Sequence, residues 1–229
     1  MARLSRGWAV CFVGCLAGVG MIRCDRIQAA APDVEHRNFA VFVDGKRGGD
    51  FHMTIQHSED GTDTVTAQAG VRISYLGGLK VYRYTYRGTE TWKAGRLQRF
   101  DSSSNDDGKE FTVSGLAAGK GLRLRVNGQD RVVRPDVWLT TYWHSPDPRF
   151  RNRAVPLLDA DTGEELAGNL IYAGLTPLNV AGQVQRCAAY QVNGNTPWEL
   201  WFDGQERLVR LKSISDGHRY ELVLTSIRR

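Results

Sequence analysis

The closest match to a catalytic motif in this sequence is Asp161-Thr162-Gly163. In aspartic proteases this triplet carries a carboxylate that needs an apolar strand before it and a second aspartate facing it, so that the pair can share a proton. Here Asp159 and Ala160 interrupt the apolar run, and no second such triplet follows an apolar strand. We therefore interpret the triplet as a hairpin turn, with a dimer that supplies the second aspartate as the alternative.

Metal-ligand patterns do not appear at the spacing that a metal site requires. In the stretch Asp159 to Glu165, a calcium loop would place Gly163 and Leu170 where it needs an acid and a bidentate glutamate, so a solvated acidic turn is favoured. The histidines lack His-x-x-x-His and His-Glu-x-x-His spacing, which leaves zinc unsupported. They are His36, His52, His57, His144 and His218. We predict no metal, no cofactor and no identifiable catalytic residue.

Other common enzyme motifs are absent from the sequence or incomplete. The sequence has no phosphate-binding Gly-x-x-x-x-Gly-Lys-Ser/Thr and no Gly-x-Ser-x-Gly nucleophile elbow. Cys187 has no His and Asn in a recognisable nucleophile motif, so a buried, inert thiol is favoured. The interpretation therefore leans away from an enzyme. The enzymatic alternative is an envelope hydrolase of unfamiliar type that uses Asp136, His144 or Asp161.

An aromatic pattern is the most informative feature. Tyr82, Tyr84 and Tyr86 alternate along an expected strand at 79–92 and project to one face, which Glu90 and Trp92 share if no bulge intervenes. These rings could line a pocket for an apolar or amphipathic ligand. Its roof would be Trp138, Tyr142 and Trp143. The alternative is that the rings simply fill the interior, as side chains do in small β-barrels.

Turn signals indicate the fold that would hold these rings. Seven Asp-Gly or Asn-Gly pairs, which favour the positive φ of tight hairpins, separate runs of alternating apolar and polar residues. The pairs are Asp44-Gly45, Asp60-Gly61, Asp107-Gly108, Asn127-Gly128, Asn193-Gly194, Asp203-Gly204 and Asp216-Gly217. We expect strands at 38–44, 49–58, 62–75, 79–92, 96–103, 109–115, 120–127, 154–159, 165–173, 182–192, 197–203, 207–214 and 218–227.

So many sequential strands must curl, since a flat sheet of this width would expose long edges. We predict an all-β, mainly antiparallel fold, either a strongly curved half-barrel or a closed barrel. The segment 128–153 breaks the pattern with three prolines, and it is expected to lie across the concave side as a loop or short helix.

The composition and the net charge exclude some classes of protein and argue against others. With 41% hydrophobic and 24% charged residues, the chain is neither a polytopic membrane protein nor wholly disordered. Of the net charge of +5, residues 1–31 carry +3, because they hold four arginines and one aspartate. The remainder is nearly neutral, and Arg83 and Arg87 lie on the strand face opposite the tyrosines. Both observations argue against nucleic acid as a partner.

Residues 1–31 are typical of a signal peptide. Arg3 and Arg6 precede an apolar run at 8–22, and small residues follow at 29–31, where we expect cleavage. The mature protein would be a single β domain at 32–229 without a transmembrane span, in the periplasm or outside the cell. An uncleaved N-terminal membrane anchor is the alternative. Cys15 and Cys24 lie in poor lipoprotein contexts, so lipid anchoring is disfavoured.

The order of the motifs resembles the exported bacterial family catalogued as domain of unknown function 6134, over about residues 37–227. The motifs are Phe39 to Gly49, Tyr82-Arg83-Tyr84 followed by Glu90-Thr91-Trp92, Tyr142-Trp143 before Asp161-Thr162-Gly163, and Leu200-Trp201-Phe202-Asp203 followed by Arg207-Leu208-Val209. The resemblance implies export and a single β domain, and it names no catalytic residue. More distantly, the pattern is similar to periplasmic lipoprotein-carrier folds, in which a curved sheet cradles acyl chains.

We therefore expect an exported cell-envelope protein that binds a lipid or another hydrophobic small molecule on the concave face of its sheet. Two other classes stay open. One is the envelope hydrolase above, and the other is a structural or protein-interaction module without a ligand. No particular envelope protein is indicated as a partner.

Overall fold

The computed structural model describes residues 33–75, 80–194, 197–215 and 217–229. The predicted signal peptide therefore lies outside the described residues. The described chain forms fifteen strands. They are β1 (Asp33–Val43), β2 (Lys46–His57), β3 (Thr62–Tyr75), β4 (Lys80–Lys93), β5 (Arg96–Asp106), β6 (Lys109–Ala118), β7 (Gly121–Val126), β8 (Gln129–Val133), β9 (Trp138–Leu139), β10 (Arg153–Leu158), β11 (Glu165–Val180), β12 (Gln183–Gly194), β13 (Trp198–Phe202), β14 (Leu208–Ser215) and β15 (His218–Arg228).

All these strands belong to one sheet, in the order β8-β7-β6-β5-β4-β3-β2-β1-β15-β14-β13-β12-β11-β10-β9. Each neighbouring pair is antiparallel except β9 and β10, which run parallel. The first and last strands, β1 and β15, pair with each other and join the two halves of the sheet. This confirms the all-β, mainly antiparallel fold.

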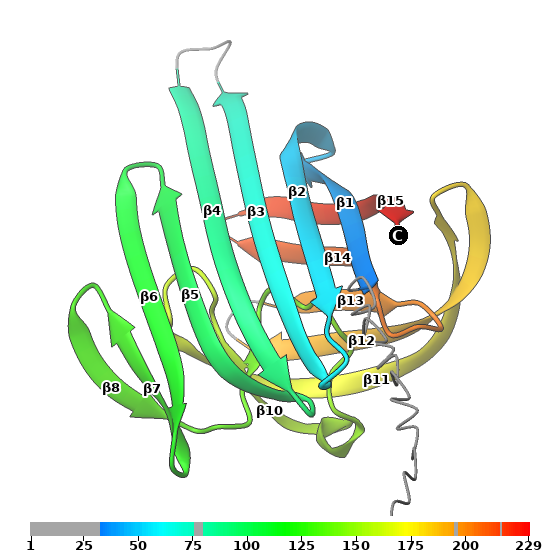
Figure 1. The fold of residues 1–229 in the computed structure, drawn as a ribbon. Helices are drawn as coiled ribbons and strands as arrows, with labels where there is room; N and C mark the ends of the chain where they lie inside the picture. The colour runs from blue at the N-terminus through cyan, green and yellow to red at the C-terminus, as the bar shows by residue number, and fades with distance from the viewer. Residues whose placement is uncertain (1–32, 76–79, 195–196, 216) are drawn as a thin grey trace, which may run out of the picture. The chain divides into compact units, whose positions relative to one another are not determined.

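The sheet curves back over itself, so that β2, β3 and β4 pass in front of strands of the second half in Figure 1. One hydrophobic core lies between the two halves and draws residues from both, among them Phe39, Phe100, Leu170 and Phe202. The hydrogen-bonded order ends at β8 and β9, so the described sheet is open and curved rather than a closed ladder.

Several hairpins form at the predicted turn pairs. Asp44-Gly45, Asp107-Gly108 and Asn127-Gly128 each have positive φ at both residues, which is the backbone that a two-residue hairpin of matching twist requires. Two further turns of the same kind, Ala94-Gly95 and Ala181-Gly182, lack the Asp or Asn that marks such turns in a sequence.

Two expectations about local structure were wrong. Asn193-Gly194 is the end of β12, where it pairs with Asn169 and Gly168 of β11, because cross-strand pairing overrides the local turn preference. The segment 128–153 is also more ordered than expected, because it contains β8 and β9 as well as a single 3-10 turn at Pro148–Phe150. Asp216 of the last predicted pair lies outside the described residues.

Candidate functional site

The tyrosine stripe of β4 faces the interior. Tyr86 is 3% exposed and Trp92 is 2% exposed, whereas Tyr82 and Tyr84 are partly buried nearer the β3–β4 hairpin end. A bulge does occur opposite Trp92, but its extra residue is Gln98 of β5, so the alternation along β4 continues unbroken. The inward orientation expected for Tyr82, Tyr84, Tyr86 and Trp92 is therefore observed.

Two of these tyrosines donate hydrogen bonds to carboxylates. The Tyr82 hydroxyl donates to Asp106 Oδ1 at 2.7 Å, and the Tyr84 hydroxyl donates to Asp161 Oδ2 at 2.6 Å. Burial, with the nearby carboxylates, raises the pKa of both phenols, so they remain neutral donors. Burial, with the adjacent charge of Asp159, raises the pKa of Asp161 to about 7.

Asp161 reaches the interior because the β10–β11 turn folds inward. The hydroxyls of Ser102 and Ser104 donate to the carbonyls of Ala160 and Asp161, at 2.7 and 3.1 Å. Gly163, at φ +73°, packs so closely on Val126 that a Cβ would lie 2.8 Å from its methyl group. The triplet Asp161-Thr162-Gly163 is thus a turn, as expected. The expected solvated acidic turn is correct only for Glu164 and Glu165, which are exposed, because side chains of β4–β7 cover much of Asp161.

The predicted roof lies over the same face. We call residues 137–144 the cover segment; within it Trp138 and Tyr142 are buried and Trp143 is partly buried. The Trp143 ring centroid lies 5.9 Å from that of Trp92, and the Trp138 and Tyr142 centroids are 4.7 Å apart. The carbonyl of Trp143 also accepts a hydrogen bond from Arg37 of β1. The structure therefore brings Trp92 and the cover segment together.

Glu90 lies between the stripe and the cover segment and is 1% exposed. Its Oε2 accepts a hydrogen bond from the Trp92 indole nitrogen at 2.7 Å. Burial raises its pKa to about 7, although Thr141 and Trp92 favour the ionised form. Sequence reasoning placed Glu90 on this face through strand parity, but no local signal indicated that Thr141 would lie beside it.

Six buried polar atoms in this region make no hydrogen bond of ordinary geometry among the described residues, although Thr141 lies close enough to Glu90 to lower its pKa. They are Tyr86 Oη, Glu90 Oε1, Thr141 Oγ1, Tyr142 Oη, Trp143 Nε1 and His144 Nε2. Two belong to β4, and four belong to the end of the cover segment. Buried polar groups in native proteins almost always have hydrogen-bond partners. The clustering of these six atoms therefore marks a position where a bound polar group would supply the missing hydrogen bonds.

The three residues considered for a hydrolase have separate surroundings. Asp136 pairs with Arg134 and Arg149 at 2.6 and 3.2 Å. His144 packs on Trp92, and burial lowers its pKa. Asp161 is held by Tyr84, as described above. The expected burial of Cys187 is confirmed, and burial raises the pKa of its thiol. Among the described residues, no group of His, Cys, Asp or Glu is arranged to hold a metal ion.

The contact between Tyr84 and Asp161 gives a testable expectation. In Tyr84→Phe, the Asp161 carboxyl loses its hydrogen-bond donor, and we expect the free energy of unfolding to fall by about 2 kcal/mol. Urea unfolding at neutral pH measures this change. Tyr172→Phe is the matched control, because Tyr172 packs on Tyr190 by its ring. Equal losses in the two variants would contradict the assigned role of the Asp161 contact.

Comparisons with known proteins agree with the fold. The model of a family described as Domain of unknown function (DUF6134) matches residues 39–225. A solved structure, the beta-barrel-like protein of domain of unknown function DUF1849 from Brucella abortus, is similar with a TM-score of 0.58 and 9% identity. The alignment covers 86% of this chain and 96% of that chain, and at this identity it shows the fold alone. No curated protein matches the chain.

Proposed function

The chain belongs to the family described as Domain of unknown function (DUF6134), and we propose that it is an exported envelope protein that binds an amphipathic small molecule. The ligand lies between the tyrosine face of β4 and the cover segment. Its apolar part packs on aromatic rings, and its polar group occupies the place left by the six unpartnered atoms. A lipid with a small polar head has this chemistry.

The unpartnered polar atoms carry the proposal. A buried polar group without a partner costs about 1–3 kcal/mol, so several together would be a large penalty if the site served packing alone. They offer a mixture of chemistries, because the Trp143 indole is a donor only, the ionised Glu90 carboxylate is an acceptor, and the hydroxyls of Tyr86 and Tyr142 do both. Such a mixture suits a hydroxyl or carboxyl head group.

The contacts of the cover segment bear on how a ligand would enter the site. The cover segment packs through rings, including Trp92 against His144 at 5.2 Å between centroids. Its backbone pairs with β10 through the two-residue strand β9, and Thr140 adds hydrogen bonds with Leu158 and Ala160, whereas the strands of the β4 side form long ladders. Entry of a ligand would therefore require separation of the short β9–β10 pairing and of the ring contacts between the cover segment and Trp92.

The binding proposal is tested by native mass spectrometry and organic extraction of protein purified from envelope fractions. We expect a co-purifying lipid, and we expect fatty acids or lysophospholipids to raise the melting temperature, because a ligand that binds only the folded form stabilises it. Acyl ligands are the first choice because the sequence is similar in pattern to lipoprotein-carrier folds. Absence of lipid together with an unchanged melting temperature across the panel would reject the proposal.

Paired variants make this test specific. The double change Tyr86→Phe with Tyr142→Phe removes two unpartnered hydroxyls, so we expect unchanged stability without ligand but a smaller melting shift with it. Tyr190→Phe is the control, since the Tyr190 hydroxyl accepts a hydrogen bond from Arg151 outside the site. A ligand shift that survives in the double variant would place the ligand elsewhere.

Export forms a separate part of the proposal and rests on the arginines and apolar run of residues 1–31. The intact mass of the protein from the periplasmic fraction should lack about the first 30 residues, as cleavage of a signal peptide requires. Among the described residues, no helix is long and apolar enough to cross a bilayer. A full-length mass in the cytosolic fraction would overturn the export proposal without affecting the ligand test.

A further inference from the structure

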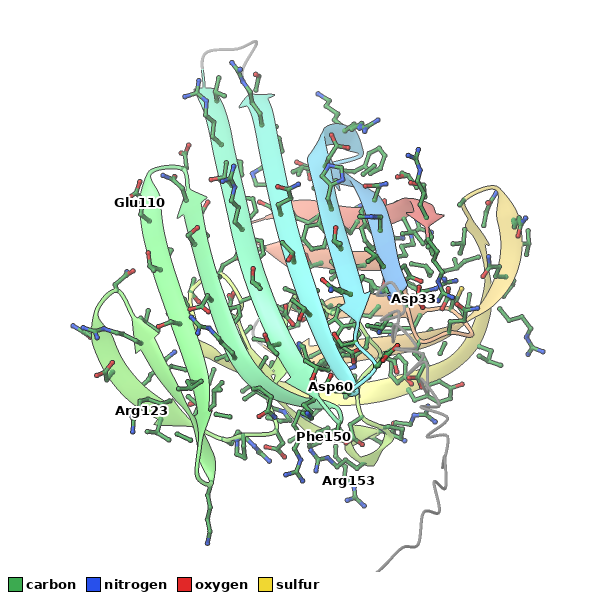
Figure 2. The ribbon with its side chains drawn as sticks, in the orientation of Figure 1. Asp33, Asp60, Glu110, Arg123, Phe150 and Arg153 are labelled. Atoms are coloured by element: carbon green, nitrogen blue, oxygen red, sulfur yellow. The ribbon has the colours of Figure 1, made fainter. Side chains whose placement is uncertain are left out.

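The outward face of β2–β6, opposite the tyrosine stripe, carries a groove. Two adjoining hollows of about 740 and 590 Å³ form it, and both are lined by Gln68, Arg87 and Ser103. It extends from Asp50 on β2 to Glu110 on β6, whose label marks one end of this face in Figure 2. This groove is separate from the interior site, because side chains of a strand alternate between the two faces of the sheet.

Hydroxyl and amide side chains dominate the groove. The outward hydroxyl and amide residues that line it are Thr66, Gln68, Thr85, Thr89, Ser103, Asn105 and Thr112, and His52 of β2 lies beside them. The lining also includes Tyr86 and Phe111, but both alternate with exposed neighbours and belong to the inward face. Hydrogen bonding, rather than ring stacking, is therefore the chemistry that the groove offers to a ligand.

One arginine without a partner among the described residues lines the groove, and two more lie beside the groove on the same face. Arg87 is exposed within it, and its guanidinium has no ion pair or hydrogen bond with a described residue. Arg72 of β3 and Arg83 of β4 lie on the same face and are directly opposite each other in the register. Like charges in such a pair repel each other, so an anion bound between or beside them would relieve the repulsion.

Two of the three acidic residues that line the groove are paired with arginines, and the third, Glu110 at the β6 end, accepts a hydrogen bond from a neutral amide. Asp50 pairs with Arg47 at 2.6 Å, and Asp101 pairs with Arg99 at 2.6 Å. The Glu110 carboxylate accepts a hydrogen bond from the Asn105 amide at 3.1 Å. Arg87 is thus the cation in the groove that is available for an external carboxylate.

We propose that this groove binds an oligosaccharide that carries carboxylate groups, such as a uronate chain. The hydroxyl and amide rows hydrogen-bond to sugar hydroxyls, and the planar guanidinium of Arg87 holds a carboxylate through two parallel N–H donors. The length of the groove across five strands suits an extended chain better than a single sugar.

Gly70 provides a way to close the groove without disturbing the fold. It lines the larger hollow, and a Cβ built on it would meet no atom within 4 Å. Its φ is not in the left-handed region, so the backbone accepts a side chain. Gly70→Leu should therefore fill the hollow, and since glycine weakens a strand interior, the melting temperature should not fall.

Calorimetric titration with oligogalacturonate tests the proposal. We expect binding by the unchanged protein, a loss of affinity of about tenfold or more in Arg87→Ala, and no detectable binding in Gly70→Leu. Arg123→Ala is the matched control, because Arg123 is exposed on β7 away from the groove and should leave the affinity unchanged (Figure 2). Melting curves confirm that each variant is folded.

Two comparison ligands make every outcome informative. A neutral oligosaccharide of the same length should bind at least about tenfold more weakly, because it lacks the charge-assisted hydrogen bonds to Arg87. Polyglutamate carries carboxylates without sugar hydroxyls and should also bind more weakly. Equal binding of either ligand, equal affinity in Arg87→Ala, or no oligogalacturonate binding at all would overturn the proposal.

Discussion

Glu35→Gln is expected to lower the free energy of unfolding by about 3–5 kcal/mol, the usual cost of removing one partner from a buried ion pair. Glu35 is 1% exposed, and its Oε1 accepts a hydrogen bond from Arg37 Nε at 2.6 Å. Arg207 lies 3.4 Å from the other carboxylate oxygen. A neutral glutamine would leave these guanidinium groups without the charge that they face.

The network around Glu35 also explains why the effect is large. Arg37 donates to the carbonyl of Trp143 in the cover segment, and Arg207 pairs with Asp203 in the β13–β14 turn at 2.6 Å. Glu35 therefore joins the first strand to the cover segment and to the second half of the sheet. Loss of the Glu35 charge should therefore weaken the contacts of β1 with both the cover segment and the second half of the sheet.

Urea unfolding at pH 7 measures the effect of Glu35→Gln, with Arg229→Ala as the control. Arg229 also binds Glu35, at 3.0 Å, but its side chain is 56% exposed, so its removal should cost less than about 1 kcal/mol. Burial alone would raise the pKa of Glu35, but Arg37, Arg229 and Arg207 lower it overall. Its stabilisation is thus present above the ordinary carboxyl pKa and lost as the pH falls. If Glu35→Gln and Arg229→Ala lowered the free energy of unfolding by similar amounts, burial of Glu35 would not explain the size of its effect.

Glu90→Gln is expected to have the opposite effect and to stabilise the protein at high pH. The folded pKa of Glu90 is about 7, against 4.5 for an ordinary carboxyl. Between these values the folded protein binds more protons than the unfolded chain, so the stability falls as the pH rises. Relative to the unchanged protein, the variant should gain about 2–3 kcal/mol between pH 4 and pH 8.

The measurement is a series of urea unfolding curves from pH 4 to pH 8 for both proteins. The difference between them isolates Glu90, because the other carboxyls are common to both. Glu59→Gln, at an exposed position in the β2–β3 turn, is the control for the same substitution on the surface and should change the free energy of unfolding at pH 7 by less than about 0.5 kcal/mol. A pH-independent difference for Glu90→Gln would mean that the carboxyl does not titrate in this window.

Local residue patterns were sufficient to predict most strands and the inward direction of Tyr82, Tyr84 and Tyr86. Alternation along a strand and the positive φ favoured by Asp-Gly or Asn-Gly depend on adjacent residues, which the sequence shows directly. The predictions were wrong where contacts with residues distant in the sequence determine the local backbone conformation. At Asn193-Gly194, for example, pairing with β11 keeps the chain extended. They also missed turns such as Ala94-Gly95, where glycine is preceded by alanine.

The candidate sites depend mainly on tertiary structure. Asp161 meets Tyr84, which is 77 residues earlier in the chain, and Glu35 meets Arg207, which is 172 residues later. The groove around Arg87 forms only because five strands curve together. The order of amino acids is enough to assign the side chains that share a face of a strand, since this depends only on backbone alternation. The tertiary structure alone decided which of them are desolvated and what they touch, because burial and charge pairing depend on the distant segments that pack over each face.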